Sequence, residues 1–349
     1  MSTERGRIDI SGFKTEAVEE RDELSDWSDE KETQLQSRWR KVAGQILRDR
    51  LALVGGIIVL VMLFSALFSR SLTIAGVTVQ PFSLTPHDPA ATLVGDIHQK
   101  PTILPPDVSF EHPMGTDRLG RDVFSRVMLG ARFSVTIGII VTGISATFGV
   151  IYGGISGYFG GRVDALLMRL VDVVFAFPAL VLTVVIVVML GQGYWQLVAA
   201  FAVVGWAGYA RIIRGEILKV KQNEYVLAAK ALGGKDRRVL FRHVIPNSIA
   251  PVVVQATLSI GTVVIGVAAL GFLGIGFTGD TAEWGTMIDA ERSTIIQGGN
   301  SGTWETWWVT VFPGLMVFIF VMAMNMIGDA INDALDAQGA DESATMGGG

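Results

Sequence analysis

The sequence has no cysteine among its 349 residues, so disulfide bonds and cysteine-ligated metal sites are excluded. It holds only four histidines, His87, His98, His112 and His243, and their spacing matches no metal-binding motif. Charged residues are scarce, at 17% of the chain, and the net charge of −5 is spread unevenly. Few residue types that carry out catalysis or bind metals therefore occur in a recognisable pattern.

Motifs for binding nucleotides are missing as well. The G-x-G-x-x-G pattern in residues 274–279 follows an apolar run and not the strand of a βαβ unit, so it does not indicate a dinucleotide site. The stretch Gly234-Lys235-Asp236 lacks both the earlier glycine and the final Ser or Thr of a P-loop. No Ser, His and Asp arrangement of a hydrolase stands out. We therefore expect a chain that is not an enzyme and holds no cofactor, and that relies on another chain for any use of ATP and Mg²⁺.

What the chain has in abundance is apolar sequence, which makes up 50% of its residues and gives a mean hydropathy of +0.46. A hydrocarbon core about 30 Å thick needs roughly 20 apolar residues of helix. Four uncharged runs predict one span each, and a fifth, longer run predicts two spans joined by a turn at 191–196. The single-span runs are 51–69, 133–161, 244–279 and 306–328, and the double run is 173–210. We predict an all-α polytopic membrane protein with six transmembrane helices, in which the glycine-rich end of 244–279 is not regular helix.

The distribution of Lys and Arg predicts how these spans are oriented. Basic residues are concentrated in residues 38–50, 162–169 and 211–242, which flank the predicted spans on the same side of the membrane. On the other side of the membrane, most Lys and Arg residues lie in one long loop, and in long loops the number of basic residues has less influence on orientation. The positive-inside rule therefore places both termini and residues 211–242 in the cytoplasm. No cleavable signal peptide is expected, because the first apolar run begins only at Leu51.

The terminal segments differ from the spans in composition. Residues 1–37 are acidic and poor in apolar residues, which predicts a disordered cytoplasmic tail. Around residues 38–50, apolar residues at helical spacing alternate with basic ones, which predicts an amphipathic helix at the membrane surface. A plain cytoplasmic extension of the first span is the alternative. Residues 336–349 are predicted to be a flexible C-terminal tail.

Residues 70–132 are predicted to be the large outer loop. Its seven prolines argue against a packed helical domain. In its last part, at 112–134, glycine and charged residues alternate with apolar ones up to the membrane. This part either binds a solute or a docking protein, or packs on the helix bundle as an ordered cap.

Four glycines recur every four residues in the second apolar run. They are Gly149, Gly153, Gly157 and Gly161. Such a ridge lets two membrane helices approach closely, which is the favoured interpretation, and a hinge is the alternative.

Charged residues avoid the centres of the predicted spans. Asp164, Arg169 and Asp172 lie at the start of the third span, and Asp329 and Asp333 lie at the end of the sixth. A proton-coupled pump would need a buried carboxylate relay and a voltage sensor would need repeated arginines. The chain has neither, which suggests a pathway lined by apolar, glycine and hydroxyl groups.

Residues 224–247, EYVLAAKALGGKDRRVLFRHVIPN, form a basic stretch between two spans. Apolar residues fall at i, i+3, i+4 and i+7 and predict a helix from Glu224 with one narrow face of small side chains. These residues are Tyr225, Ala228, Ala229 and Leu232. Gly233-Gly234 should end this helix, a second basic helical segment follows at 235–243, and Pro246 ends that segment. Such a face suits insertion into a groove on a partner, and a basic loop resting on anionic lipid is the alternative.

The same stretch resembles a known signature. Leu227-Ala228-Ala229-x-x-x-Gly233, then nine residues and His243-x-Ile245-Pro246, is similar to the E-A-A-x-x-x-G-x9-I-x-L-P signature of ABC-importer permeases. Leu227 replaces the Glu, His243 the first Ile, and Ile245 the Leu. These departures put any role of the Glu side chain in doubt but keep the helix–glycine–helix shape.

Further motifs resemble one branch of that family, the C-type subunit of the dipeptide/oligopeptide permeases. The longest is His112-Pro-x-Gly115-Thr116-Asp117-x-x-Gly120-Arg121-Asp122-x-x-Ser125-Arg126. The others are Gly130-x-Arg132-x-Ser134, Gly160-Gly161-x-x-Asp164 with Arg169-x-x-Asp172, and Glu283-Trp284-Gly285-x-Met287. The resemblance covers residues 45–335, nearly everything except the tails.

The resemblance implies a type I ABC importer fold in a prokaryotic inner membrane, with a five-helix permease core at 133–335 and cytoplasmic coupling helices at 224–243. It implies four partners: a second homologous permease, two ATPases that hold ATP and Mg²⁺, an outer solute-binding protein, and a peptide or related solute. Nucleic acid is not among them. The residues implied to couple to the ATPases are Glu224, Tyr225, Ala228, Ala229, Leu232, Gly233 and Pro246.

Two other hypotheses follow from the residues alone. A stand-alone secondary transporter would show buried midplane ions or broken helices in inverted repeats. The sequence has no mid-span charge and no second copy of the 224–247 pattern. A membrane-embedded hydrolase would need paired polar catalytic groups at membrane depth, and none is convincing.

Overall fold

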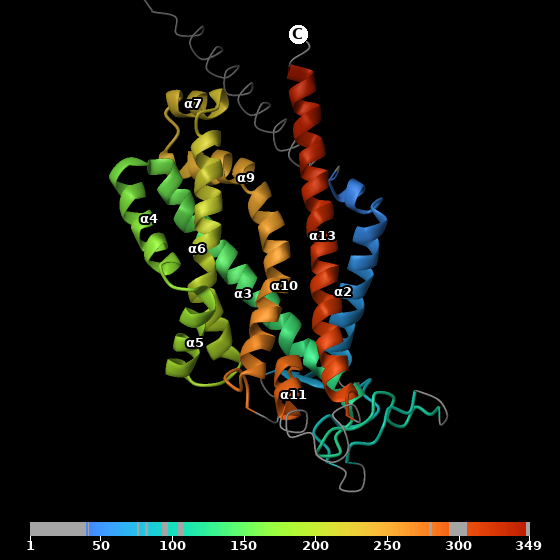
Figure 1. Cartoon of the computed structure of the whole chain (residues 1–349). Coiled ribbons are helices and arrows are strands. Elements are labelled where there is room, and N and C mark those ends of the chain that lie inside the picture. Colours follow the sequence, from blue (N-terminus) through green and yellow to red (C-terminus); the bar gives the residue numbers. More distant parts are fainter. Residues whose placement is uncertain are drawn as a thin grey trace, which may run out of the picture. The chain divides into compact units, whose positions relative to one another are not determined.

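The computed structural model describes residues 40, 42–74, 77–80, 83–92, 97–103, 108–278, 281–292 and 306–346. The chain divides into two compact units, of which the larger comprises Arg50–Asn332 and the smaller combines Met1–Asp49 with Asp333–Gly349. The larger unit is a bundle of long helices (Figure 1). The predicted disordered tail, residues 1–37, lies outside the described residues.

Among the described residues, seven long helices build the bundle. They are α2 (Arg50–Phe68), α3 (Val123–Phe159), α4 (Gly161–Phe175), α5 (Ala179–Leu190), α6 (Tyr194–Val220), α10 (Ala250–Phe272) and α13 (Trp308–Met346). Short elements connect them: α7 (Glu224–Ala231), α8 (Asp236–Val239), a π-helix (Leu240–Val244), α9 (Ile245–Ser248) and α11 (Trp284–Ala290). A two-stranded antiparallel hairpin, β1 (Leu72–Ile74) and β2 (Val77–Gln80), begins the outer loop and pairs Ile74 with Val77.

Five of these helices, α2, α3, α6, α10 and α13, are long and apolar enough to cross a membrane. The pair α4 and α5 passes the same test together but bends by 83° at its break, so the described helices give up to six spans. This agrees with the six predicted from hydropathy. The long double run also divides where expected, because α5 ends at Leu190, Gly191 and Gly193 have positive φ, and α6 begins at Tyr194.

Two predicted boundaries in the first half of the bundle are wrong. The second span begins at Val123 and not at residue 133, because the carboxylate of Asp122 accepts a hydrogen bond from the Ser125 amide and caps the helix ten residues earlier. Residues 162–169, predicted to be a cytoplasmic loop, belong to α4. The third span is therefore a bent pair, and its break falls just before α5, where Pro178 cannot continue a helix.

Of the predicted boundaries in the second half of the chain, the structure confirms one and corrects another. α10 ends at Phe272, and the glycine-rich residues after it form turns, as predicted. α13 instead continues to Met346, past the boundary at 336 where a flexible tail was expected. In the predicted interfacial segment, residues 42–46 are helical and a turn at 47–48 separates them from α2.

A close helix contact joins α3 to α6. A Cβ added at Gly149 would lie 2.6 Å from the Trp206 carbonyl oxygen, and one added at Gly153 would overlap the Ala210 carbonyl. At Gly157 it would lie 3.0 Å from the Arg214 carbonyl oxygen. The packing interpretation of the glycine ridge is therefore confirmed at three positions. Gly161 instead adopts a φ of +53° at the turn into α4, with no atom near its missing side chain.

We expect Gly153→Ala to destabilise the protein by about 1–3 kcal/mol, because the added methyl group meets backbone that cannot rotate away. Gly143→Ala is the matched control, since it lies on the same helix with nothing within 4 Å of the added atom. Thermal or chemical unfolding of the purified variants in detergent measures the difference. Equal stability of the two variants would contradict this account of the α3–α6 contact.

Candidate functional site

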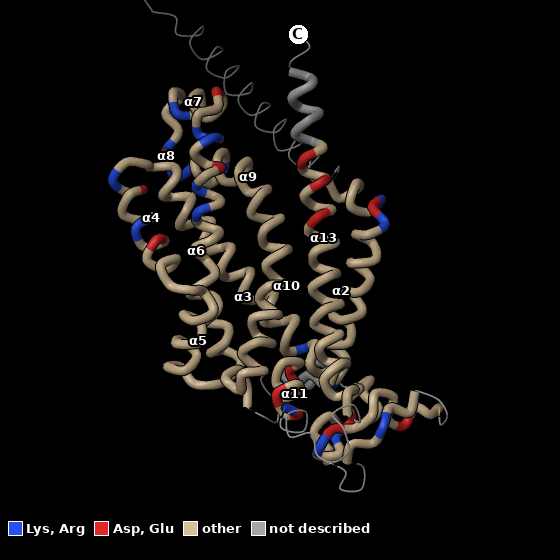
Figure 2. The backbone as a smooth tube through the Cα atoms, in the orientation of Figure 1, with Lys and Arg blue, Asp and Glu red and all other residues tan. Residues whose placement is uncertain are grey.

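The predicted helix at 224–231 is present as α7 and stands at the end of the bundle opposite the outer loop (Figure 1). Figure 2 shows Lys and Arg gathered around α7 and α8, whereas α5 and α10 carry no charged residue. One buried side chain, Val226, anchors the helix. Tyr225 and Ala229 pack beside it, against a cluster that includes Val239 and Leu240.

The exposed side of α7 differs from the face predicted by periodicity. Tyr225 and Ala229 face the protein, whereas Ala228 and Leu232 face outward. Leu227 and Leu232 expose 53% and 68% of their surface, so large apolar side chains are presented outward. We define the docking face of α7 as the exposed residues Glu224, Leu227, Ala228, Ala231 and Leu232. Only Ala228 and Leu232 of the predicted face are thus exposed, because alanines occur on both sides of the helix and their spacing alone could not show which side is anchored.

The end of α7 is built around Gly233, which has a φ of +79°. The Gly234 amide donates to the Ala229 carbonyl at 3.0 Å, which closes the helix end as predicted. Nothing lies within 4 Å of the position that a Cβ of Gly233 would occupy. Glycine is therefore needed here for its backbone conformation alone.

The second basic segment is more irregular than predicted. Residues 236–239 are α-helical, and the following residues form a π-helix up to Val244. Pro246 does not end this segment but lies in the first turn of α9, which follows the π-helix directly.

Three contacts attach this region to the inner end of α3. The Tyr158 hydroxyl donates to Asp236 at 2.8 Å, and the Lys230 ammonium lies 4.4 Å from the centre of the Tyr158 ring. The Lys221 ammonium donates to the Gly157 carbonyl at 2.8 Å. α7 and α8 are thus held to the bundle on the side away from the docking face.

The charged motif at the start of α4 forms ion pairs with α6. Asp164 accepts hydrogen bonds from the Arg214 guanidinium, at 2.6 Å for Nη2, and from Ser156. Asp172 pairs with Arg211 at 3.0 Å, but both side chains are more than half exposed, so this pair adds little stability. These residues pair in the structure, as their place near span ends suggested.

The outer motif is a network of buried polar side chains. Asp117 accepts from the Arg121 side chain at 2.6 Å and lies 3.7 Å from Arg126, and Asp122 caps α3. Gly115 and Gly120 have φ values of +75° and +73° at the turns of the motif. The side chains buried in it are Thr116, Asp117, Arg121, Asp122, Ser125 and Arg126. These contacts favour the ordered-cap interpretation over a solute site, because the polar groups face one another.

A second buried carboxylate, that of Glu283, caps a helix, a role that the sequence motif did not predict. Burial raises the pKa of this carboxyl, which caps α11 by accepting from the amides of Gly285 and Thr286 at 3.0 and 2.9 Å. The neighbouring Trp284 indole donates to the Val127 carbonyl of α3 at 3.0 Å. Glu283, Trp284 and Gly285 therefore lock α11 against α3. The sequence motif named these residues but gave no role for them.

A groove of about 570 Å³ runs between α6 and α10. Its lining combines the glycine, hydroxyl and apolar groups expected of a pathway with two charged residues, and its place between α6 and α10 was not predicted. The lining residues are Gly205, Gly208, Tyr209, Arg211, Ile212, Gly215, Glu216, Gln255 and Ser259. The spacing of the three glycines on α6 was the available signal.

Comparison with known proteins places this arrangement in a family. The family described as "Binding-protein-dependent transport system inner membrane component" matches residues 149–338, which is more than half of the chain. The chain belongs to this family. A second match, "N-terminal TM domain of oligopeptide transport permease C", covers residues 37–101 of this permease.

Curated relatives match nearly the whole permease. It is 35% identical to the dipeptide transport system permease protein DppC of Bacillus subtilis, over 86% of this chain and 85% of that protein. It is 36% identical to DppC of Alkalihalophilus pseudofirmus, over 86% and 90%. It is 34% identical to the glutathione transport system permease protein GsiD of Salmonella typhimurium, over 88% and 92%.

Family membership decides between the hypotheses drawn from the sequence. This permease is a multi-pass inner-membrane subunit of an ABC importer, and it works with a binding protein and with ATPase activity in separate subunits. The prediction of a transporter component that is not itself an enzyme is confirmed. The stand-alone secondary transporter and the membrane-embedded hydrolase are set aside.

We expect Gly233→Val to lower solute uptake per ATP hydrolysed at least about fivefold, because a β-branched residue resists the left-handed conformation by 1–2 kcal/mol. Gly233→Asn is the matched control, since asparagine tolerates this conformation and should retain most coupling. Uptake and ATP hydrolysis are measured together in proteoliposomes that hold the complete importer. An unchanged ratio for the valine variant would show that this turn does not serve coupling.

Proposed function

We propose that this permease moves short peptides into the cell and is driven by ATPases that dock on α7. The curated relatives named above are described as dipeptide and glutathione transport permeases, and both solutes are short peptides. The charge-poor helices α5 and α10 suit a pathway that makes little distinction between peptide side chains. Selection would then lie mainly in the binding protein that delivers the solute.

The proposed assembly holds a second, homologous permease and two ATPase subunits. The groove between α6 and α10 is open on one side, as expected of half a pathway that a second permease completes. The end of the bundle with α7 faces the cytoplasm in this proposal, because Lys and Arg are concentrated there.

The docking face of α7 is the observation that carries the proposal. Leu227 and Leu232 are exposed at the basic end of the bundle, and Ala228 between them leaves room for close approach. Exposed apolar side chains on a helix that is anchored from behind by Val226 suit the groove of a partner protein. A loop that only rests on anionic lipid would need the Lys and Arg but not a rigidly held apolar face.

We expect Ala228→Asp to lower peptide uptake at least about tenfold, because the new carboxylate would enter an apolar contact without a partner. Ala229→Asp is a poorer test, since Ala229 packs against the protein and its replacement would disturb α7 itself. Ala91→Asp is the matched control, because Ala91 is an exposed alanine in the outer loop. Uptake of a labelled dipeptide by cells, with membrane content measured by immunoblot, is the readout. Normal uptake by the Ala228 variant would refute docking on this face.

We also expect Gly208→Phe to block uptake while leaving the melting temperature unchanged. A Cβ at Gly208 has nothing within 4 Å, so the ring would fill the groove without straining the fold. Gly208→Ala is the control and should transport normally. Co-purification of the second permease is measured in parallel. Loss of that subunit from the phenylalanine variant would make the groove an interface and not a pathway.

A further inference from the structure

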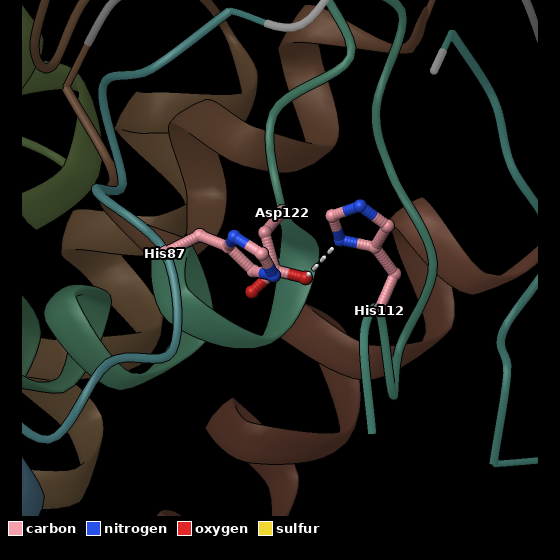
Figure 3. A group of neighbouring side chains, drawn as sticks. All are labelled: His87, His112 and Asp122. Carbon is pink, nitrogen blue, oxygen red and sulfur yellow. Dashed lines mark hydrogen bonds and ion pairs between the residues drawn. The ribbon is translucent and has the colours of Figure 1, made fainter. Parts of the chain in front are cut away.

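Three potential metal ligands meet in the outer part of the permease. His87, His112 and Asp122 each offer one ligand atom, and these atoms all lie within 4.8 Å of one another. The His112 Nδ1 atom lies 3.0 Å from Asp122 Oδ1, and the two imidazole rings lie 4.6 Å apart (Figure 3). The three residues are separated by 25 and 10 positions in the sequence, so no spacing rule could have found them.

The surroundings of His87 set which of its nitrogens is available. Its Nε2 atom lies 2.6 Å from the carbonyl oxygen of Glu111. A carbonyl oxygen can only accept a hydrogen bond, so Nε2 must carry the proton. In the neutral ring Nδ1 then holds the free lone pair. A metal-binding histidine is usually oriented in this manner, by donating its other ring nitrogen to a backbone carbonyl or a carboxylate.

Asp122 is held in a similar way. Its Oδ2 atom accepts from the Ser125 amide at 2.8 Å, which fixes the carboxylate at the start of α3 and leaves Oδ1 directed toward His112. Both Asp122 and His112 are almost fully buried, whereas His87 is half-buried. His112 and Asp122 are therefore already positioned inside the cap, and His87 is the ligand most exposed to solvent.

Two of the three ligand atoms have nearly the spacing of a zinc site, and the His87 atom, within 4.8 Å of both, must approach them by up to about 1.5 Å. Ligands at 2.0–2.1 Å from tetrahedral zinc lie about 3.3 Å from one another. The His112 and Asp122 atoms, now 3.0 Å apart, would need to separate by only a few tenths of an ångström. Two imidazoles and one carboxylate are ligands that zinc prefers, and a water molecule on the His87 side would complete four.

We propose that His87, His112 and Asp122 bind a zinc ion that fastens the outer cap to the start of α3. The proton of neutral His112 moves from Nδ1 to Nε2, so none is lost from the ring, and zinc then coordinates His112 Nδ1, His87 Nδ1 and Asp122 Oδ1. The ion joins three segments, the loop around His87, the turn at His112 and the first turn of α3. The cap would then resist local opening more strongly than its hydrogen bonds alone allow.

The test uses the full-length permease in detergent, purified through an affinity tag without histidine and stripped with EDTA. ZnCl₂ is titrated by calorimetry, and Co²⁺ is added separately, because tetrahedral Co²⁺ shows strong visible absorption. We expect one zinc ion per chain, a tetrahedral Co²⁺ spectrum and a higher melting temperature with zinc. H87A should weaken zinc binding at least about tenfold and abolish the rise in melting temperature.

His98→Ala is the matched control. His98 lies in the same outer loop but pairs with Glu291 at 3.1 Å, outside the three ligands, so H98A should bind zinc like the unaltered chain. Asp122→Asn should also weaken binding, and it keeps a side-chain oxygen that can cap α3. Should H87A fail to fold, H87Q replaces it, because its amide can still donate to the Glu111 carbonyl.

Each contrary result overturns the proposal. Absence of zinc binding by the unaltered chain, or equal affinity in H87A, would mean that His112 and Asp122 form only a hydrogen bond. Loss of binding in H98A but not in H87A would place the ion on His98 and Glu291. A Co²⁺ spectrum typical of octahedral coordination would contradict the tetrahedral site.

Discussion

The contact between α3 and α6 is the constraint on which the rest of this permease depends. Within a bilayer, helices gain no hydrophobic energy by leaving lipid, so they associate through close packing of backbone and small side chains. Gly149, Gly153 and Gly157 place no side chain where α3 meets the backbone carbonyls of Trp206, Ala210 and Arg214 on α6. α3 can therefore act as one rigid rod of 37 residues, fixed to the bundle along its inner half.

The two ends of α3 organise the two ends of the molecule. At its start, Asp122 caps the helix, and the buried pairs around Asp117 and Arg126 fold the outer motif over it. At its other end, Tyr158 donates to Asp236 and its ring contacts the Lys230 ammonium, so α3 contacts the segment that carries α7. A single helix thus connects the proposed docking face of α7 with the outer cap.

Hydropathy predicted the helical runs well because a lipid-facing helix must be apolar over a length set by the membrane. It could not predict the start of α3, which depends on one carboxylate, or the 83° break before α5. The resemblance to permeases pointed to the residues around Glu283 and Asp117, and only the structure shows that Glu283 caps α11 and that Asp117 pairs with Arg121. Spacing could not show that Tyr225 and Ala229 pack against the protein, because alanines occur on both sides of α7 and the burial of Val226 depends on the tertiary fold.

The cluster of His87, His112 and Asp122 was the feature least predictable from the sequence. Metal motifs read from sequence rely on ligands within one helix or one loop, where spacing sets geometry. Here two separate segments, one with His87 and one with His112, pack at the start of α3, and this brings both histidines close to Asp122. The capping carboxylate uses one oxygen for the helix and keeps the other for the imidazole. Asp122 therefore both caps α3, the helix that connects the two ends of the bundle, and belongs to the histidine cluster in the outer cap. An ion bound there would act directly on α3, which contacts the segment that carries α7.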